Sequence, residues 1–498
     1  MKLRKCKDID VLFIAEGTYP FVRGGVSTWI HQIITGMKDL NFGIIFIGSR
    51  KEDYGKLKYE LPPNLVFLEN LYLFSGKSEP GSAYREGKED VRDILCLLRE
   101  DEDIPDKLSS IHFYRERITP EDFLYGKRTW EALRDFYFEI GMEVPFISFL
   151  WTIRNILTPL WKLADFAYEI VRKNLNVALI HSPSTGYAGF LGCLLKDYID
   201  TPLIITEHGI YTRERKLDIL SSCFTEETRK QFIKDFKYVW INFFLNLGKI
   251  CYRKADRIFS LFEGARYLQI TMGCDPSKAF VIPNGVKPLP FRSKWEKEKK
   301  IIGLIGRVTP IKDVKTFIKA LKILSHSLPK VEAWIVGPEE EDPEYATECK
   351  IMVKALGIER NVKFLGFKKI SEVLPYIKVL VLSSISEGMP MVILEAFSAG
   401  IPCVSTDVGS CRQLIEGGLN EEDRKLGKAG ELVKVGDYKG LAHFCKTLLE
   451  DRNLWEQYSN TAFERARRFY SYENFIDSYR SVYLNYGASK NGRCFNRA

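Results

Sequence analysis

The feature that most constrains the fold is a regular alternation between short runs rich in valine, isoleucine and leucine and longer segments with helical spacing. Short, continuous apolar runs are typical of strands buried on both faces of a parallel sheet, and helical segments between them serve as crossovers. In the first half the runs are DVLFIAEG, FGIIFIGS, NLVFLEN, VALIHSPS, PLIITEHG, RIFSLF and AFVIPNG. In the second half they are IIGLIGRV, VEAWIVGP, VKFLGF, VLVLSS, IPCVSTD and GELVKV. The alternation predicts an α/β protein with two doubly wound, Rossmann-like sheets.

The length of the chain agrees with two domains, because 498 residues exceed what one hydrophobic core usually holds. The segment 287–300, KPLPFRSKWEKEKK, begins with two prolines and ends in mixed charge, so we expect the hinge there. We therefore expect a first domain over 1–290, a second over 291–465, and a helical tail over 466–498 that crosses back to the first domain. Residues 51–173 interrupt the alternation with charged sequence and are expected to form a helical insertion in the first domain.

The composition excludes several classes of protein. The 73 basic and 65 acidic residues are spread along the chain and give a formal charge of only +8, which does not suggest a nucleic-acid binder. The 11 cysteines are scattered, with no C-x-x-C pair and no histidine cluster at metal-ligand spacing, as expected for a reducing cytoplasm. The apolar stretches at 146–161 and 238–247 are too short to span a membrane. Peripheral contact with the inner membrane stays open.

A pair of glutamates stands at a predicted helix start in the second half. In SEGMPMVILEAFSAG, Pro390 suits the first helical position and Gly400 the helix end, so Glu395 is expected about one turn into the helix and Glu387 in the loop before it. A helix start suits a phosphate, and flanking carboxylates would accept hydrogen bonds from hydroxyl groups on either side, as a nucleotide sugar requires. A dipole-stabilised surface helix with an ordinary salt bridge is the alternative, and from this stretch the two readings are equally supported.

Two cations follow the first strand of the second half. GLIGRVTPIKD places Arg307 and Lys312 in one loop, where they could converge on a diphosphate whose negative charge grows as a sugar leaves. A solvated basic loop is the alternative. After the first strand of the chain, GTYPFVRGGVSTW carries Gly24 and Gly25, which let backbone approach a ligand closely. This loop is not a dinucleotide fingerprint, and a plain turn is its alternative.

A histidine follows a strand of the first half in ITEHGIYTRER. His208 stands between that strand and a glycine, so it is expected to point toward the cleft between the two sheets, although single histidines are more often structural. Arg213 and Arg215 could bind acceptor or phosphate, or pair with acids such as Glu214.

Together these motifs resemble glycosyltransferase family 4, whose members have the GT-B fold, two Rossmann-like domains facing across a cleft. The likeness covers nearly the whole chain and is weakest over 51–173. The family's E-x7-E motif is similar to Glu387 and Glu395, its Arg/Lys pair to Arg307 and Lys312, its glycine-rich loop to Gly24 and Gly25, and its first-domain histidine to His208.

The resemblance implies transfer of a hexose from a UDP-sugar with retention of configuration and without a metal or other cofactor. It implies that Glu387 contacts the hexose, that Glu395 binds the ribose hydroxyls, and that the Arg/Lys pair binds the diphosphate. The remaining implied contacts are Gly388, Met389 and Met391 at donor hydroxyls and phosphate, His208 near the reacting sugar, and Phe364 near the uracil. The family's front-face attack, in which the leaving phosphate helps to deprotonate the acceptor, explains why no catalytic acid and base pair is visible.

More narrowly, EGTYPFVRGGVSTWIHQ, STGYAGFLG and TEHGIYTRERK are similar to the cytosolic glycosyltransferases of Pel exopolysaccharide biosynthesis in biofilms. That likeness implies a polysaccharide acceptor and protein partners in an inner-membrane Pel complex. Two other classes stay open: a non-catalytic GT-B assembly subunit, and a GT-B-like sugar-nucleotide epimerase. Glucose, N-acetylglucosamine and N-acetylgalactosamine are all candidates for the transferred hexose.

Overall fold

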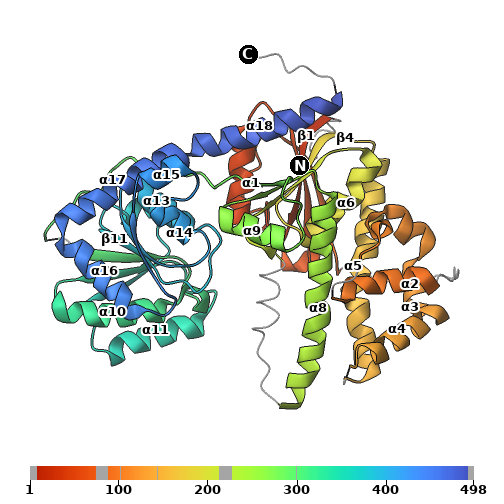
Figure 1. The fold of residues 1–498 in the computed structure, drawn as a ribbon, viewed down its shortest axis with the longest axis horizontal. Coiled ribbons are helices and arrows are strands. Elements are labelled where there is room, and N and C mark those ends of the chain that lie inside the picture. The colour runs from red at the N-terminus through yellow and green to blue at the C-terminus, as the bar shows by residue number, and fades with distance from the viewer. Residues whose placement is uncertain are drawn as a thin grey trace. The chain divides into compact units, whose positions relative to one another are not determined.

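The computed structural model describes residues 8–74, 88–100, 103–142, 144–211, 227–298 and 300–491. These residues form two compact units, each built on its own parallel sheet (Figure 1). The first unit comprises Met1–Ser260, Arg266–Phe280 and Tyr479–Ala498, and the second comprises Leu261–Ala265 and Val281–Ser478. Every strand expected from the alternation is present, so the prediction of two Rossmann-like α/β sheets is confirmed.

The first unit contains a seven-stranded sheet in the order β3-β2-β1-β4-β5-β6-β7. Its strands are β1 (Asp8–Glu16), β2 (Phe42–Gly48), β3 (Leu65–Tyr72), β4 (Asn176–Ser182), β5 (Leu203–Glu207), β6 (Arg257–Ser260) and β7 (Ala279–Val281). Its helices are α1 (Gly25–Gly36), α2 (Lys88–Leu95), α3 (Pro120–Tyr125), α4 (Lys127–Glu139), α5 (Phe146–Arg172), α6 (Gly186–Ile199), α8 (Glu227–Lys254) and most of α9 (Glu263–Thr271). The short helical turns are η1 (Lys51–Asp53), η2 (Cys96–Leu98), η3 (Asp106–Ser109) and η4 (Phe113–Arg117).

Alternate residues of β1 serve the two faces of this sheet, as the two-residue period of a strand requires. Leu12 and Ile14 belong to the large core that α5, α6 and α8 complete. On the other face, the Phe13 ring lies 5.9 Å from the Trp29 ring of α1. The central strand is therefore buried on both sides, which is why its sequence is continuously apolar.

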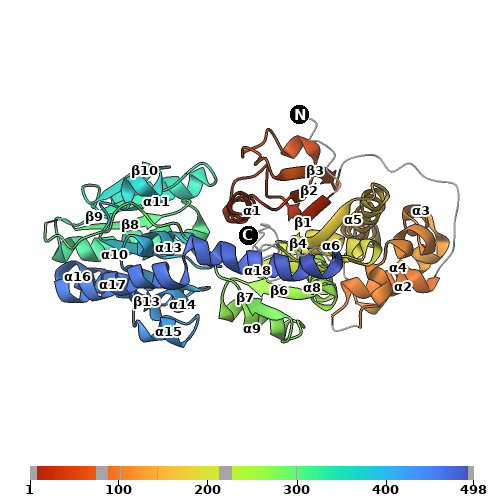
Figure 2. The same cartoon turned by 90° about the horizontal axis from the view of Figure 1, so that it is seen from above.

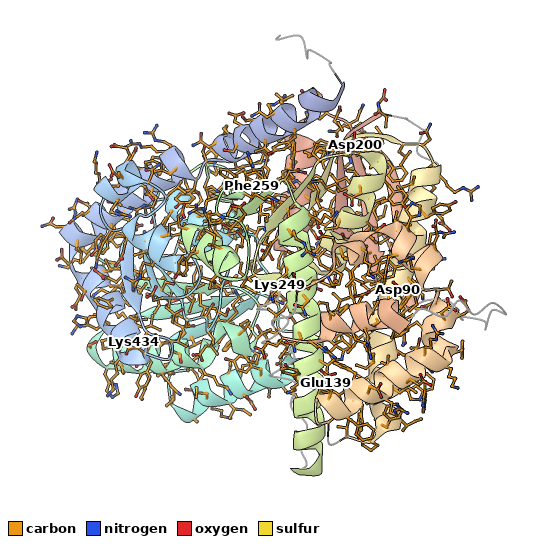
Figure 3. All side chains as sticks on the ribbon, turned by 45° about the vertical axis from the view of Figure 1, so that its right-hand side comes forward. Asp90, Glu139, Asp200, Lys249, Phe259 and Lys434 are labelled. Carbon is orange, nitrogen blue, oxygen red and sulfur yellow. The ribbon has the colours of Figure 1, made fainter. Side chains whose placement is uncertain are left out.

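The insertion expected over 51–173 is helical only in part. Its beginning contains β3, which pairs in parallel with β2 and extends the sheet, so the expected range starts too early. The helices follow from α2 onward: α5 lies beside α6, and α3 and α4 lie beyond α5 (Figures 1 and 2). Ion pairs join distant residues of this layer, with 2.6 Å from Arg99 to Glu139 and 3.2 Å from Lys107 to Asp90; Glu139 and Asp90 are labelled in Figure 3.

The second unit contains a six-stranded sheet in the order β10-β9-β8-β11-β12-β13. Its strands are β8 (Ile301–Ile305), β9 (Glu332–Val336), β10 (Val362–Gly366), β11 (Val379–Leu382), β12 (Cys403–Thr406) and β13 (Gly430–Val433). Its helices are α10 (Val314–Ser327), α11 (Pro343–Ala355), α12 (Ile370–Val373), α13 (Met391–Ser398), α14 (Cys411–Glu416), α15 (Glu421–Lys425), α16 (Tyr438–Glu450), α17 (Arg452–Phe469) and the start of α18 (Tyr472–Asn491), with the short turn η5 (Pro310–Lys312).

The two faces of the second sheet have separate cores. Val379 and Val381 of β11 pack with α10, α11 and α16, whereas Leu380 and Leu382 pack with α13 and α14. The sheet is thus doubly wound. The strand order reverses between β8 and β11, and in such sheets ligands bind beyond the carboxyl ends of the strands at this reversal.

The segment 287–300, where the hinge was expected, is attached to the second unit. Ser293 N donates to Ala399 O at 2.7 Å, and the buried Lys378 ammonium donates to Lys294 O at 2.8 Å. The chain instead passes from the first unit to the second at 280–281. A proline-rich, charged sequence suggests a linker, but these backbone contacts with the core are not visible in composition.

The tail forms the two aromatic-rich helices α17 and α18, and residues from Tyr479 onward belong to the first unit. There the Tyr483 hydroxyl lies 2.9 Å from His181 Nδ1, and His181 Nε2 lies 2.8 Å from the Thr206 hydroxyl. Because all three side chains are buried, these hydrogen bonds fix the end of the chain on the first sheet.

Candidate functional site

The loops after β8 and β11 meet at the strand-order reversal of the second sheet. Ile385 N donates to Ile311 O at 2.8 Å, and the Ser383 hydroxyl donates to Lys312 O at 2.9 Å. These bonds hold the loop that carries Lys312 against the loop that carries Glu387. The topology therefore brings together two of the sequence motifs at the place where open α/β sheets bind ligands.

Lys312 and Glu387 form an ion pair at this point. Lys312 Nζ lies 2.6 Å from Glu387 Oε1, and the Ser384 hydroxyl donates to the same oxygen at 2.6 Å. The side chains retain 20% and 11% of their exposure, so the pair is largely shielded from water and Coulomb attraction is stronger there than at the surface. Both donors occupy Oε1, which leaves Oε2 available to accept a hydrogen bond from a ligand hydroxyl.

Arg307 does not converge with Lys312 in this structure. Its Nη1 pairs with Glu341, 2.5 Å from Oε1 and 2.7 Å from Oε2, and both side chains are about half exposed. Of the two cations expected to converge, only Lys312 lies beside Glu387, because Arg307 pairs instead with the Glu341 carboxylate on the loop after β9. Such an exposed pair is weak, so a diphosphate could compete for Arg307.

The turn after β12 packs against the loop from Glu387 to Met389. Ser410 N donates to Gly388 O at 2.9 Å. Gly409 has a φ of 55°, and a Cβ at that position would lie 2.2 Å from Glu387 O, so only glycine allows this close approach. Met389 is buried and its Sδ accepts from Asn284 N at 3.4 Å.

Glu395 lies on the second turn of α13, as expected from the sequence. The helix begins at Met391, with Pro390 at its N-cap rather than at its first position, and it ends before Gly400, whose φ is 68°. Burial raises the pKa of the Glu395 carboxyl to about 7. No hydrogen-bond partner contacts this carboxylate within the described ranges, so a ligand hydroxyl could provide the missing partner.

Two further expected donor contacts, Phe364 and Met391, belong to the second unit. Phe364 is in β10, and the Lys350 ammonium lies 5.5 Å from its ring centroid. Met391 is the first residue of α13 and is half-buried.

Gly24 and Gly25 stand at the start of α1, in the first unit. Gly24 is the N-cap residue and Gly25 the first helical residue, and a Cβ at either position would meet no atom within 4 Å. The first turn of α1 contains no acidic residue and no side-chain cap, so its N–H groups are available to an anion.

His208 follows β5 in the first unit. Its ring lies 4.6 Å from the Trp29 ring at an edge-on angle of 82°. Burial lowers the pKa of His208 to about 3, so the imidazole is neutral at physiological pH, and its Nε2 has no hydrogen-bond partner among the described residues. A neutral ring can exchange hydrogen bonds with a substrate but supplies no positive charge. Arg213 and Arg215 lie outside the described residues.

Sequence reasoning missed the glutamate next to His208. Glu207 is 1% exposed and accepts hydrogen bonds from the hydroxyls of Tyr252 at 2.7 Å and Thr185 at 3.1 Å, and from Gln269 Nε2 at 2.9 Å. Burial raises the pKa of Glu207 although these donors oppose the change. A charged residue at the end of an apolar strand is the sequence signal that could have identified it, and its role is to hold the loop that carries His208.

The described ranges contain no group of three or more His, Cys, Asp and Glu side chains that could hold a metal ion. Asp8 and Asp10 serve the sheet, since Asp8 accepts from Asn176 Nδ2 at 2.9 Å and Asp10 from Asn41 N at 2.7 Å. Among the helices that the structure describes, none has the length and apolar character to cross a membrane.

Solved structures that are similar to this chain share its fold at low sequence identity. Anabaena HepE in complex with UDP matches with a TM-score of 0.59 and 16% identity, over 95% of this chain and 99% of that one. Sucrose-phosphate synthase of Thermosynechococcus elongatus matches with a TM-score of 0.59 and 14% identity, over 96% and 99%.

Curated relatives match over part of the chain. The UDP-Gal:alpha-D-GlcNAc-diphosphoundecaprenol alpha-1,3-galactosyltransferase of Escherichia coli is 26% identical over 308 residues, 58% of this chain and 70% of that protein. The N-acetyl-alpha-D-glucosaminyl L-malate synthase of Bacillus anthracis is 30% identical over 189 residues, 38% of this chain and 46% of that protein. The chain thus spans about half the length of the second relative.

Two family models together cover most of the chain. Residues 9–277, more than half of the chain, match a domain of unknown function, DUF3492. Residues 287–465 match the glycosyl transferases group 1 family. The second match contains Lys312, Glu387 and Glu395. The chain therefore belongs to the DUF3492 family and is a glycosyltransferase of the GT-B fold, with a glycosyl transferases group 1 domain as its second unit.

Proposed function

We propose that this protein transfers a hexose from a UDP-sugar to a growing exopolysaccharide of the Pel type, with retention of configuration and without a metal. The observation that carries the proposal is the Lys312–Glu387 pair at the strand-order reversal of the second sheet, next to the start of α13. A cation, a helix N-terminus and two carboxylates match the charges and hydroxyls of a nucleotide sugar. The named relatives, one of which uses UDP-galactose, and the HepE complex with UDP support a UDP-sugar donor.

Each residue has a specific task in the proposed reaction. Lys312 and the N–H groups at the start of α13 neutralise the diphosphate, and Arg307 joins them when it exchanges Glu341 for phosphate. Oε2 of Glu387 accepts from a hexose hydroxyl, and Glu395 accepts from the ribose hydroxyls. Gly388, Met389 and Met391 line the path between these groups, and Phe364 lies toward the uracil.

The chemical step breaks the bond between the anomeric carbon and the leaving phosphate oxygen. An acceptor hydroxyl attacks from the same face, and its proton passes to the departing diphosphate, so configuration is retained. Negative charge grows on that diphosphate, and fixed cations therefore stabilise the transition state more than the ground state. Neutral His208 and the open backbone at Gly24 and Gly25 contact the reacting sugar in this proposal.

The acceptor and partners follow from the narrower resemblance. STGYAGFLG and the other motifs similar to the PelF type favour an exopolysaccharide acceptor, a cytoplasmic location and protein partners in an inner-membrane Pel complex. Among the curated relatives, an exopolysaccharide phosphotransferase of Streptomyces coelicolor is 28% identical over 43% of the chain.

Binding and product analysis test the proposal. Calorimetric titration should show that UDP and one of UDP-glucose, UDP-N-acetylglucosamine or UDP-N-acetylgalactosamine bind more tightly than ADP and GDP. Incubation with donor and acceptor should give a new α-linked glycosidic bond, detected by NMR, that forms equally in EDTA. A free nucleotide sugar with an inverted centre would instead identify an epimerase, and binding without turnover would identify an assembly subunit.

A further inference from the structure

The described part of the second unit contains buried polar atoms without hydrogen-bond partners, most of them on loops near Lys312 and Glu387. In the part of that unit that the structure describes, four side-chain atoms have this property: Asn284 Oδ1, Ser293 Oγ, Thr309 Oγ1 and Ser410 Oγ. Three of them belong to loops that contact Gly388 and Met389 or that carry Lys312. Buried polar groups in native proteins nearly always have partners, so each of these atoms is a candidate for contact with a ligand.

Asn284 is fixed beside Met389 by the turn that contains it. Its side chain is 8% exposed, and its backbone N–H donates to Met389 Sδ at 3.4 Å. The next residues are anchored, because Val286 N donates to Tyr470 O at 2.8 Å and a Cβ on Gly285 would lie 2.5 Å from Phe475 Cβ. The backbone on which the Asn284 amide stands is therefore held in place.

Ser410, in the turn after β12, contacts the same loop. It is fully buried, its N–H donates to Gly388 O at 2.9 Å, and its hydroxyl does not cap α14. The backbone N–H groups of Asn284 and Ser410, more than a hundred residues apart in the sequence, thus bind the consecutive residues Met389 and Gly388, and each of the two has an unpartnered side-chain oxygen.

The chemistry of the unpartnered atom selects the part of the donor that it contacts. Asn284 Oδ1 is an acceptor and needs a hydrogen-bond donor. An ionised diphosphate offers none, whereas sugar hydroxyls do. Since Glu395 is placed to accept from the ribose, the hexose is the remaining source of a hydroxyl near Met389.

We propose that Asn284 is a hexose-binding residue of the donor site, with its Oδ1 accepting from a hydroxyl of the transferred sugar and Ser410 contributing a second contact. Access requires a shift of Met389, whose unbranched thioether side chain adopts alternative conformations readily. The inference rests on the proposed UDP-sugar donor. It adds to that donor site a residue from the turn after β7, outside the E-x7-E and Arg/Lys motifs.

The test compares Kd values by calorimetry for UDP, which lacks the hexose, with those for UDP-glucose, UDP-N-acetylglucosamine and UDP-N-acetylgalactosamine. In Asn284→Ala, UDP should bind as in the wild type, and the preferred UDP-hexose should bind about 3- to 10-fold more weakly, the loss of one hydrogen bond. Asn284→Asp keeps an accepting oxygen and should keep the wild-type ratio of the two Kd values. Ser293→Ala is the matched control: it removes an equally buried, unpartnered hydroxyl, which lies near Ala399 at the opposite end of α13.

The outcomes separate this inference from the proposed function. If Asn284→Ala leaves the ratio of the UDP and UDP-hexose Kd values unchanged, or if Ser293→Ala changes it as much, Asn284 does not bind the hexose. If Asn284→Ala does not fold, the Asn284→Asp variant decides. A ratio of the UDP Kd to the Kd of the preferred UDP-hexose that falls from its wild-type value toward one in that variant refutes the inference. A wild-type protein that binds neither UDP nor any of the UDP-hexoses overturns the proposed function and the inference together.

Discussion

Replacing Lys312 by alanine tests the electrostatic reasoning at the donor site most directly. The substitution removes one charge-assisted hydrogen bond to the diphosphate, which contributes about 1.5–3 kcal/mol, so UDP should bind about 10- to 150-fold more weakly. It also leaves Glu387, which is 11% exposed, with the Ser384 hydroxyl as its described donor. Breaking a fully buried pair costs about 3–5 kcal/mol, and partial exposure of this pair reduces the expected loss of stability to about 1–2 kcal/mol.

Calorimetry with UDP and with uridine separates these two effects. Uridine lacks the diphosphate, so its affinity should stay at the wild-type value while UDP affinity and turnover of the UDP-sugar fall. Lys315→Ala is the control, because Lys315 pairs with Glu348 at 2.6 Å on the exposed surface of the same helix-loop region. Wild-type UDP affinity and turnover in Lys312→Ala would refute the role of this lysine, and an equal loss of uridine affinity would show a general distortion of the site.

Three other substitutions test single residues of the second unit. Glu395→Gln should be stabilised relative to the wild type, increasingly as the pH rises from 4.5 to 7. The pKa of Glu395 is raised to about 7 in the folded state, so ionising the wild-type carboxyl costs free energy above pH 4.5 and costs none below it. A difference in melting temperature that does not change with pH would contradict this. Gly409→Ala should push Glu387 out of position and abolish most turnover. It should also cost about 2–4 kcal/mol of stability in urea unfolding, because left-handed strain adds to the clash of the new Cβ with Glu387 O; wild-type turnover would show that the loop adapts. Arg465→Ala should destabilise the second unit by about 3–5 kcal/mol, because Arg465 Nε lies 2.6 Å from the fully buried Asp423 and the substitution leaves that carboxylate without a counter-charge. A loss below about 1 kcal/mol in denaturant unfolding would show that water or rearrangement compensates.

Local sequence determined the secondary structure well. Each strand of the two sheets was recognisable as a short apolar run, because strands buried on both faces admit few polar side chains. The end of α13 was also readable, since Gly400 adopts the left-handed conformation that glycine favours. The expected insertion over 51–173 began too early, because it included the NLVFLEN run that forms β3, the half-buried edge strand of the first sheet.

Long-range pairings were not readable in the same way. Lys312 and Glu387 are 75 positions apart and meet only because β8 and β11 are neighbours in the sheet. The partner of Arg307 is Glu341, on a loop that composition describes only as acidic. The segment 287–300 has the composition of a linker, yet backbone hydrogen bonds attach it to the second unit.

The sequence by itself determined that this chain builds two parallel α/β sheets and which loops carry chemically useful side chains, because strand period, helix ends and turn residues are encoded within a few neighbouring positions. Only the tertiary structure decided which of those side chains share a site and in which protonation state. Strand order sets the distance between loops, and burial sets the pKa of groups such as Glu395 and His208, since the cost of charge depends on surroundings contributed by distant parts of the chain.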